Sequence, residues 1–466
     1  MKHPWLILFI IFLLALLLRL FILSQRGSLW FDEAFSAHFA AMDLREMWSF
    51  LKFENNPPLY FVLLHFWMKL FGSSELAVRA LSMVFGLAAI PMVYGLGRKL
   101  HSATAGLFAA FLLAISTFQV FYATETRMYA LYLFLALVAV WLFLTIEHNV
   151  PQRKLKFYIL HFTFFITLLL LVWTHITAWL IVLAMFAYLL WQEKFHFKQF
   201  VIHHSKFLIL GALLALQFLP WLVNFITLKV AVPLSQGWFF YLPPDRNYFL
   251  DIMETFLIFG EENAFVVTLL SVIVAILLWY AVRKANIFSP CPRGRLRGGG
   301  SEPPLNPLLE EEGKSVRFLL CWLLVPLLVG FAFQNAVPRY FIAVAPAFYL
   351  LLGIGFSQWA ENKRSRIFVP LASLLIFALV LSDYPSLAKI GHHQWDKLAG
   401  WVSQMQNEKC KMQNDCLVLI NPHSEILPFE RYYRGKLPVM GFYPRDDRDS
   451  RDMRIVRRNW ISLADE

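Results

Sequence analysis

Long apolar runs separated by short polar segments dominate this chain. Eleven of them approach the roughly 20 residues that an α-helix needs to cross the hydrocarbon core of a bilayer. The runs lie at residues 5–23, 79–97, 104–122, 129–146, 157–174, 176–191, 206–223, 263–281, 318–334, 340–357 and 367–382. The pattern predicts an α-helical polytopic membrane protein with about 11 transmembrane helices.

Basic residues fall into clusters that alternate with these runs. The clusters are Lys2; Arg98 and Lys99; Arg153, Lys154 and Lys156; Lys194, Lys198 and Lys206; Arg283, Lys284, Arg293, Arg295 and Arg297; and Lys363, Arg364 and Arg366. Since cytoplasmic loops are enriched in Lys and Arg, every cluster lies on one side if the N-terminus is cytoplasmic. We therefore expect a multi-pass protein of the plasma (inner) membrane, whose first run is a retained anchor.

One apolar stretch is excluded from this count. Pro58 to Phe71 is short for a span and contains His65 and Lys69, so it suits an interfacial helix. Residues 24–78 are then a single outer loop with two or three amphipathic helices.

The chain changes character twice outside the spans. Residues 286–316 are rich in Gly, Pro and charge, which predicts a flexible cytoplasmic loop. After a transmembrane domain of residues 1–385, residues 386–466 combine a helical pattern with apolar runs at 416–422 and 436–444 that suggest strands. This predicts a small C-terminal α/β extracytoplasmic domain.

Composition supports a membrane protein and excludes other classes. Of the 466 residues, 59% are hydrophobic, and a soluble domain cannot bury that much apolar surface. The net charge of +11 suits anionic lipid better than nucleic acid, because the basic residues are split among short clusters. Four cysteines are too few for a disulfide scaffold; Cys410 and Cys416 either pair in an oxidising compartment or stay two thiols.

This topology gathers chemically active side chains on the outer face. Four separate loops contribute them: Asp32 and Glu33; Glu125 and Arg127; His175; and Arg339 and Tyr340. Ionisable groups near membrane depth usually face a cavity or a partner rather than lipid. A carboxylate can accept a proton from a hydroxyl, and arginines bind phosphate oxygens. Together they suit a lipid phosphate whose attached group passes to an acceptor.

Each residue also has an ordinary interpretation. Asp32 could cap the helix that starts near Glu33. Glu125 and Arg127 could pair with each other or lie among headgroups. His175 could be interfacial, and Arg339 could be an interface anchor.

Several segments together resemble the polytopic GT-C glycosyltransferases. They are "WFDEAFSAHFA", the stretch "NNPPLYFVLLHFWMKLFGSSELAVRALSMVFGLAAIPMVYGLGRKL", "YATETRMYALY", "WTHI" and "PRYFIAVAPAFYLLLG". Within that superfamily the chain looks most like the dolichyl-phosphate-mannose–protein mannosyltransferases and their bacterial relatives, the aminoarabinose transferases that modify lipid A. The resemblance covers roughly residues 1–385.

The resemblance implies an inverting transfer of a sugar from a polyprenyl-phosphate donor to a glycolipid, glycan or protein on the outer face. It implies that Asp32 is the general base, with Glu33 as helper or alternative, and that Glu125 orients the acceptor or substrate. Arg127 and Arg339 would hold the carrier phosphate. The family's second-loop acid is usually Asp rather than Glu, and the repeated β-trefoil modules of eukaryotic protein mannosyltransferases are missing here.

The resemblance implies that Tyr340 and His175 are supporting hydrogen-bond donors at that phosphate. The acids would allow a divalent metal ion, although no ligand spacing demands one. Two other functions stay open. A lipid or sugar transporter or flippase needs charges deep within spans or broken-helix repeats at matching positions. A non-catalytic membrane scaffold uses its outer domain to bind a partner.

Overall fold

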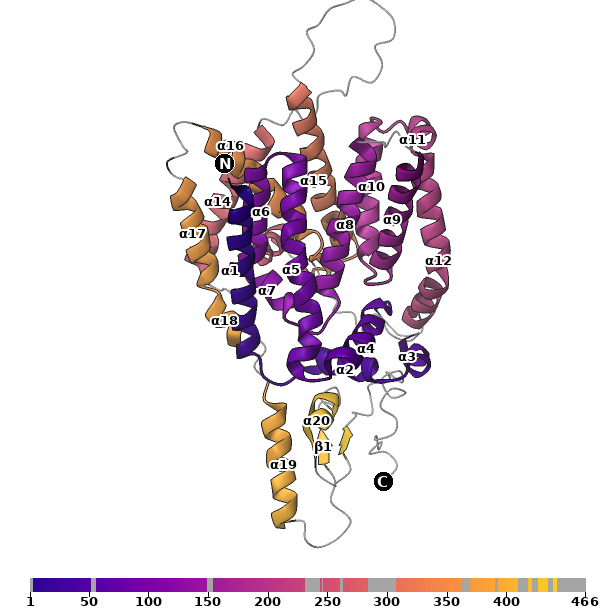
Figure 1. Ribbon diagram of the computed structural model, residues 1–466, viewed down its shortest axis with the longest axis vertical. Coiled ribbons are helices and arrows are strands. Elements are labelled where there is room, and N and C mark those ends of the chain that lie inside the picture. Colours follow the sequence, from indigo (N-terminus) through magenta and orange to yellow (C-terminus); the bar gives the residue numbers. More distant parts are fainter. Residues whose placement is uncertain are drawn as a thin grey trace, which may run out of the picture.

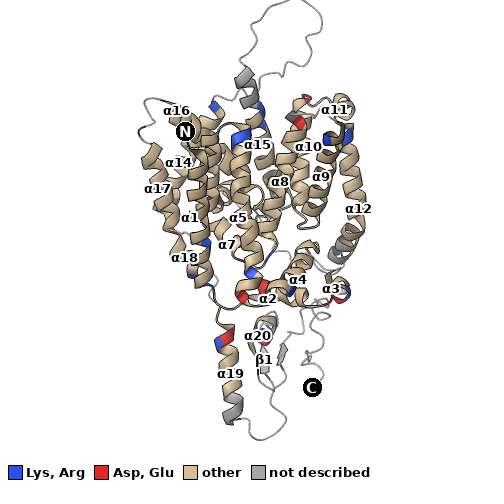
Figure 2. Cartoon of the chain, viewed as in Figure 1, with Lys and Arg blue, Asp and Glu red and all other residues tan. Residues whose placement is uncertain are grey.

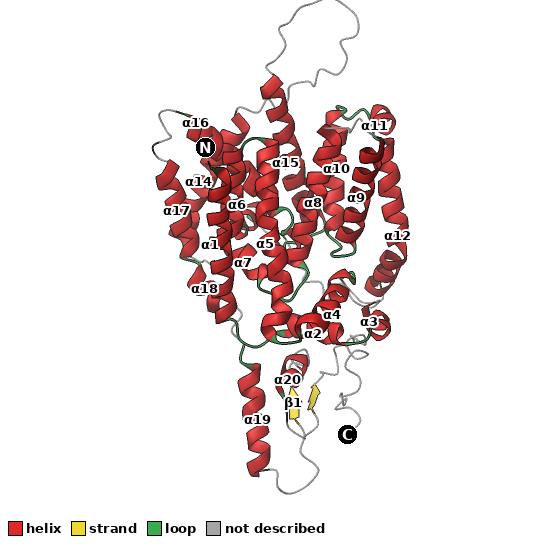
Figure 3. Ribbon diagram, viewed as in Figure 1, coloured by secondary structure: helices red, strands yellow, loops and turns green. Residues whose placement is uncertain are grey.

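The computed structural model describes residues 3–51, 56–148, 154–230, 244, 246–259, 263–283, 307–362, 367, 369–389, 393–409, 418–420, 426–434 and 439–441. Almost all of this structure is helical, and its two strands are short (Figure 3). The long helices stand side by side in one bundle, with shorter helices across one end (Figure 1).

The bundle is built from the apolar runs of the sequence. Its helices are α1 (Pro4–Gln25), α5 (Glu75–Leu100), α6 (Ala103–Ile115), α7 (Thr117–Ala123), α8 (Tyr129–His148), α9 (Lys154–Val172), α10 (Ala178–Gln192), α11 (Phe197–His203), α12 (Ser205–Val230), α14 (Ala264–Arg283), α15 (Pro307–Ala332), α16 (Ala345–Glu361) and α17 (Val369–Leu381). The serines Ser74, Ser102 and Ser116 cap α5, α6 and α7 by accepting a backbone N–H, as expected of N-cap residues.

The expected polytopic helical fold is confirmed, but the eleven runs are not eleven simple spans. Eight helices of the described residues are long and apolar enough to cross a membrane, or up to 10 if each bent pair counts as one. The run at 104–122 breaks between α6 and α7 with a 63° bend, and α10 and α11 meet at 111°. The run at 340–357 corresponds to α16, which has 17 residues.

Three short helices lie within residues 24–78 and close one end of the bundle, while the last residues of that predicted loop already belong to α5. They are α2 (Phe31–Ala41), α3 (Leu44–Leu51) and α4 (Leu59–Phe71), and they lie across the ends of the long helices in Figure 1. We call this end the α2 face. His65 of α4 contacts the carbonyl oxygen of Ala40 at the end of α2 through Nδ1, at 2.9 Å, which ties the two helices together.

Charged residues gather at the two ends of the bundle, while its middle is largely uncharged (Figure 2). The upper ends of α15 and the α10–α11 region carry basic residues on the side opposite the α2 face. This distribution agrees with the predicted alternation of basic clusters. Which end faces the cytoplasm stays a prediction.

The C-terminal part lies beyond the α2 face (Figure 1). After α18 (Tyr384–Lys389) come α19 (Trp395–Lys409), β1 (Val418–Ile420), α20 (Ile426–Tyr432) and β2 (Val439–Gly441). The two strands pair in parallel, with Val418 opposite Val439, and they lie within the two runs predicted as strands. That residues 386–466 form a separate domain stays a prediction, and Cys410 and Cys416 lie outside the described residues.

The prediction of a flexible loop over residues 286–316 is wrong at its C-terminal end. Helix α15 begins at Pro307, because Pro is favoured at a first helical position and "LLEEEGKSVRFLL" contains strong helix formers. Ser315 is already buried and donates to the carbonyl oxygen of Leu100 at 2.8 Å. Residues 284–306 lie outside the described residues.

Small residues let the long helices approach closely. A β-carbon on Gly355 of α16 would lie 1.8 Å from the carbonyl oxygen of Leu277 in α14. Membrane helices commonly pack on small residues in this way, since lipid provides no hydrophobic force to press them together.

The Gly355→Ala variant should therefore be destabilised, because backbone must move to admit the methyl group. Overpacking of this kind costs about 1–3 kcal/mol. Thermal unfolding in detergent measures the loss. Gly211→Ala in α12 is the matched control, because a β-carbon there meets nothing within 4 Å and alanine favours the helix. Equal melting temperatures for the two variants would contradict this account of the contact.

Candidate active site

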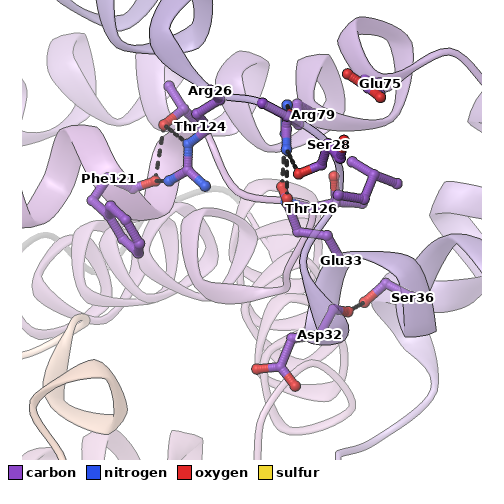
Figure 4. Close-up of polar contacts among 12 residues, drawn as sticks. Arg26, Ser28, Asp32, Glu33, Ser36, Glu75, Arg79, Phe121, Thr124 and Thr126 are labelled. Carbon is purple, nitrogen blue, oxygen red and sulfur yellow. Dashed lines mark hydrogen bonds and ion pairs between the residues drawn. The ribbon is translucent and has the colours of Figure 1, made fainter. Parts of the chain in front are cut away.

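The two acids at the start of α2 point in opposite directions (Figure 4). The helix begins at Phe31, its N-cap residue is Trp30, and the cap has no side-chain hydrogen bond. The interpretation of Asp32 as the cap is therefore wrong. Asp32 and Glu33 occupy the first turn, where negative charge is favoured by the helix dipole, and successive side chains leave the helix about 100° apart.

Glu33 is fully engaged inside the protein. Its carboxylate accepts two hydrogen bonds from Arg79 of α5, Nε to Oε1 at 2.9 Å and Nη2 to Oε2 at 2.7 Å, and a third from the backbone N–H of Thr126 at 3.0 Å. Both members of the pair are buried. Burial alone would raise the pKa of Glu33, but the contacts with Arg79 hold this pKa below its ordinary value. Glu33 is therefore an anchored anion rather than an available base.

Asp32 is held differently. Its Oδ2 lies 4.0 Å from Nε of Arg127 and 3.9 Å from Nη1 of Arg339. These distances are ion-pair contacts, longer than hydrogen bonds, and the Asp32 side chain is 18% exposed. A carboxylate thus lies between two guanidinium groups and remains accessible.

Arg127 is positioned from two sides. Its Nη1 donates to the hydroxyl of Ser36 in α2 at 3.2 Å. Its carbonyl oxygen accepts from Ser82 of α5 at 3.0 Å, and Ser82 is hydrogen-bonded in turn to the hydroxyl of Tyr60 in α4 at 2.8 Å. The loop between α7 and α8 is therefore fixed both to α2, which carries Asp32, and to α5.

Glu125 lies in the same loop as Arg127, and its carboxyl group differs from that of Glu33 in its partners and in its pKa. It is 1% exposed, and within the part of the chain that the structure describes its Oε2 is buried with no hydrogen-bond partner. Burial raises the pKa of Glu125 to about 7; Arg26 opposes the shift, and the charges of Glu33 and Asp32 add to it. Near neutral pH this carboxyl group is therefore partly protonated and can donate or accept a proton.

Arg26, just after α1, holds the beginning of this loop. It donates to the carbonyl oxygen of Phe121 at 2.9 Å and to the hydroxyl of Thr124 at 3.2 Å, and its guanidinium group lies 4.4 Å from the Phe121 ring centre. The residue thereby joins the end of α1 to the loop of Glu125.

His175 and Tyr340 complete the cluster. The Nδ1 of His175 accepts the backbone N–H of Thr177 at 3.2 Å, so the proton of the neutral ring lies on Nε2. That atom is buried and has no hydrogen-bond partner among the described residues. Burial, together with the charges of Arg127 and Arg339, lowers the pKa of His175 to about 3. The hydroxyl oxygen of Thr177 lies 2.7 Å from the same Nδ1 and 3.0 Å from the carbonyl oxygen of Tyr340.

The structure therefore brings the predicted side chains of four loops together at the α2 face. Asp32, Arg127 and Arg339 meet directly, and the ring centres of His175 and Tyr340 lie 5.5 Å apart. Glu33 lies behind this group, facing Arg79.

Sequence reasoning missed several residues of this site. Arg79 and Arg26 were not recognised because each lies at or just beyond the end of an apolar run. A basic residue there is usually taken as the end of a membrane span. A charged residue inside the first turns of a membrane helix was the available signal for Arg79. Tyr122 and Tyr129, whose rings are 4.9 Å apart beside Glu125 and Arg339, looked like ordinary apolar positions.

No metal site is evident in the part of the chain that the structure describes. No group of three His, Cys, Asp or Glu side chains there is placed to hold a metal ion. Metal dependence stays a question for experiment.

Comparison with known proteins agrees with this arrangement. The family model of dolichyl-phosphate-mannose-protein mannosyltransferase matches residues 55–223, which include α4 and the loop of Glu125 and Arg127. No curated protein matches the sequence.

Similar folds occur among solved structures. ArnT from Cupriavidus metallidurans, solved with bound undecaprenyl phosphate, is 15% identical with a TM-score of 0.62, over 100% of this chain and 90% of its own. The oligosaccharyltransferase of Archaeoglobus fulgidus is 14% identical with a TM-score of 0.55, over 92% of this chain and 64% of its own. The resemblance to the GT-C membrane glycosyltransferases is confirmed at the level of family model and fold.

The two neighbouring acids should differ sharply in their effect on stability. Glu33→Ala leaves the buried Arg79 without its carboxylate, and breaking a buried ion pair costs about 3–5 kcal/mol. Asp32→Asn removes only long, partly exposed contacts and should cost about 1 kcal/mol or less. Thermal unfolding of both variants in detergent compares them, and similar losses would contradict the separate roles.

Glu125 should make stability depend on pH. A pKa raised from 4.5 to about 7 means that the folded protein binds this proton more tightly than the unfolded chain. The stabilisation is complete below about pH 4.5 and is lost as the pH rises through about 7; it amounts to about 3 kcal/mol. The difference in stability between wild type and Glu125→Gln, followed from pH 5 to 8, isolates this contribution, and a pH-independent difference would exclude it.

Proposed function

We propose that this protein is an inverting glycosyltransferase that moves a sugar from a polyprenyl-phosphate donor to an acceptor hydroxyl at the α2 face. The observation that carries the proposal is the accessible carboxylate of Asp32 between Arg127 and Arg339. Such a site combines a proton acceptor with two donors suited to a phosphate group.

The geometry divides the reaction among these residues. The acceptor hydroxyl oxygen attacks C1 of the sugar while the bond from C1 to the phosphate oxygen breaks and leaves its electron pair on the phosphate. The hydroxyl proton passes to the Asp32 carboxylate. Arg127 and Arg339 compensate the charge that grows on the leaving phosphate. Attack from the side opposite the phosphate inverts the anomeric centre.

Two further groups serve as neutral partners. The Nε2–H of His175 is a buried donor with no hydrogen-bond partner, and a phosphate or sugar oxygen would satisfy it. The partly protonated Glu125 can hold an acceptor or sugar hydroxyl. Tyr340 supports the donor side, since its ring lies 5.8 Å from the guanidinium carbon of Arg339.

The similar proteins support the class of substrate. ArnT was solved with undecaprenyl phosphate, and the archaeal oligosaccharyltransferase was solved with an inhibitory peptide and a dolichol-phosphate. Both carriers are polyprenyl phosphates. We extend this chemistry to the present chain and propose that the α2 face is the outer face of the plasma (inner) membrane, with a lipid, glycan or protein as acceptor.

One buried charge lies within a predicted span, where a transporter would need it. It is Arg19, which lies inside α1 and is 1% exposed. Its Nη1 donates to the carbonyl oxygens of Ala15 and Ala114 at 3.1 and 3.2 Å. These contacts join α1 to α6, so Arg19 has a structural role that does not favour transport.

The Asp32→Asn variant separates catalysis from donor binding. Loss of a general base typically lowers a rate about 10²–10⁴-fold, so sugar transfer should fall by that factor. Binding of a sugar-free polyprenyl phosphate should persist or tighten, because a negative charge beside the phosphate is removed. Arg339→Ala should instead weaken that binding.

Two measurements check this prediction. Mass spectrometry of glycolipids and glycoproteins from a deletion strain identifies the sugar and acceptor, and strains carrying each variant then report transfer. Titration of purified protein with polyprenyl phosphate reports binding. Retained transfer in Asp32→Asn would remove Asp32 as the base, and an unchanged glycan profile in the deletion strain would count against the enzyme.

A further inference from the structure

The segment that leads into α2 is held by the C-terminal part of the chain. We call residues 27–30 the α2 linker. The backbone N–H of Ser28 donates to the carbonyl oxygen of His393 at 2.8 Å. The Ser28 hydroxyl donates to Oδ1 of Asp396 at 2.6 Å, and the backbone N–H of Asp396 donates back to that hydroxyl at 3.1 Å. The start of α19 is therefore joined to the linker by three hydrogen bonds.

Tyr432, at the end of α20, adds a contact on the next residue. Its hydroxyl accepts the backbone N–H of Leu29 at 2.8 Å and donates to Oε1 of Glu75 at 2.5 Å. Leu29 is fully buried, so without this hydroxyl its N–H would need another partner. One phenol thus links α20, the α2 linker and the first turn of α5.

The same linker is held from the inside by Arg79. While it binds Glu33, Arg79 also donates to the carbonyl oxygens of Gly27 at 2.9 Å and Ser28 at 3.3 Å. Figure 4 shows this guanidinium group between Ser28 and Glu33. The linker is fixed between Arg79 on one side and the C-terminal residues on the other.

Gly27 shows how close the outer contact is. A β-carbon at this position would lie 1.9 Å from the carbonyl oxygen of His393. Only glycine lets the two backbones approach this closely.

From these contacts we infer that Tyr432 and Asp396 are positioning residues for the transfer reaction, fixing the linker and through it the direction of Asp32. The inference rests on the proposed function, since it assigns the C-terminal segment to the framework of that same site. Asp32 follows the linker by two residues, at the start of a helix whose first turn has no side-chain cap. A misplacement of about 1 Å in a reacting group can cost about 10²-fold in rate.

The Tyr432→Phe variant tests the inference with the smallest change. It keeps the ring and removes the one hydroxyl that joins Leu29 to Glu75. We expect kcat to fall about 10-fold or more, while KM for the donor stays within about 2-fold because Arg127 and Arg339 are untouched. Ser28→Ala, which removes the hydrogen bond to Asp396 instead, should give the same fall in kcat with the same small change in KM. Each rate is divided by the fraction of protein that binds sugar-free polyprenyl phosphate. Partly unfolded protein then does not lower the measured kcat.

Ser403→Ala is the matched control. Ser403 lies in the same α19, and its hydroxyl donates to the carbonyl oxygen of Ala399 in that helix at 2.8 Å. It should keep wild-type kcat and KM. Equal kcat for Tyr432→Phe and Ser403→Ala, or a loss confined to donor KM, would overturn the inference.

Amide hydrogen exchange separates this inference from the proposed function, because it needs no activity. In Tyr432→Phe the peptide that contains Ser28 and Leu29 should exchange faster than in wild type, and in Ser403→Ala it should not. If the wild type transfers no sugar but this peptide exchanges faster in Tyr432→Phe, the proposed function fails while the contact between Tyr432 and the α2 linker is supported. If transfer is found and exchange is unchanged, the positioning role fails alone.

Discussion

The arrangement of this site depends on the buried ion pair between Arg79 and Glu33. Removing two charges from water is costly, and the cost is recovered only when their remaining hydrogen-bonding groups are satisfied. Here Glu33 also accepts the Thr126 N–H, and Arg79 also donates to Gly27 and Ser28. One pair thus joins α5, the start of α2 and the loop between α7 and α8. The start of α2 carries Asp32 and the loop carries Glu125 and Arg127, all residues of the proposed reaction.

This ion pair also explains why the two adjacent acids, Asp32 and Glu33, can have different roles. With Glu33 fixed toward α5, the helical rotation sends Asp32 to the other side, between Arg127 and Arg339. The anchored acid sets the direction of the accessible one. A single acid in this position could not both hold the loop and accept a proton.

Much of the fold was predictable because it follows from local pattern. The helices that cross the bundle coincide with apolar runs, and the short proline-led stretch became α4, since 13 residues are too few to span a bilayer. The bends could not be predicted. The break at Ser116 depends on its hydroxyl donating to the carbonyl oxygen of Phe256, 140 residues away, and the early start of α15 depends on packing.

The site was predictable only in part of its membership, since Arg26 and Arg79 were missed, and it was not predictable in its roles. Charge and topology placed Asp32, Glu33, Glu125, Arg127, His175 and Arg339 together, yet nothing local distinguishes Asp32 from Glu33. Only the partner at Arg79, 46 residues away, decides which acid is anchored. Likewise, no pattern shows that Glu125 is buried while Asp32 is accessible, because burial is set by helices distant in sequence.

The charges of the site favour an anion as its occupant. Two guanidinium groups flank one accessible carboxylate, and the nearest other groups, His175 and Glu125, are neutral or partly so because burial disfavours their charged forms. A phosphate placed beside Arg127 and Arg339 would balance this excess of positive charge. The same two guanidinium groups that hold Asp32 at 4.0 and 3.9 Å would then bind the donor phosphate. The base and the leaving group would therefore be positioned by one pair of residues.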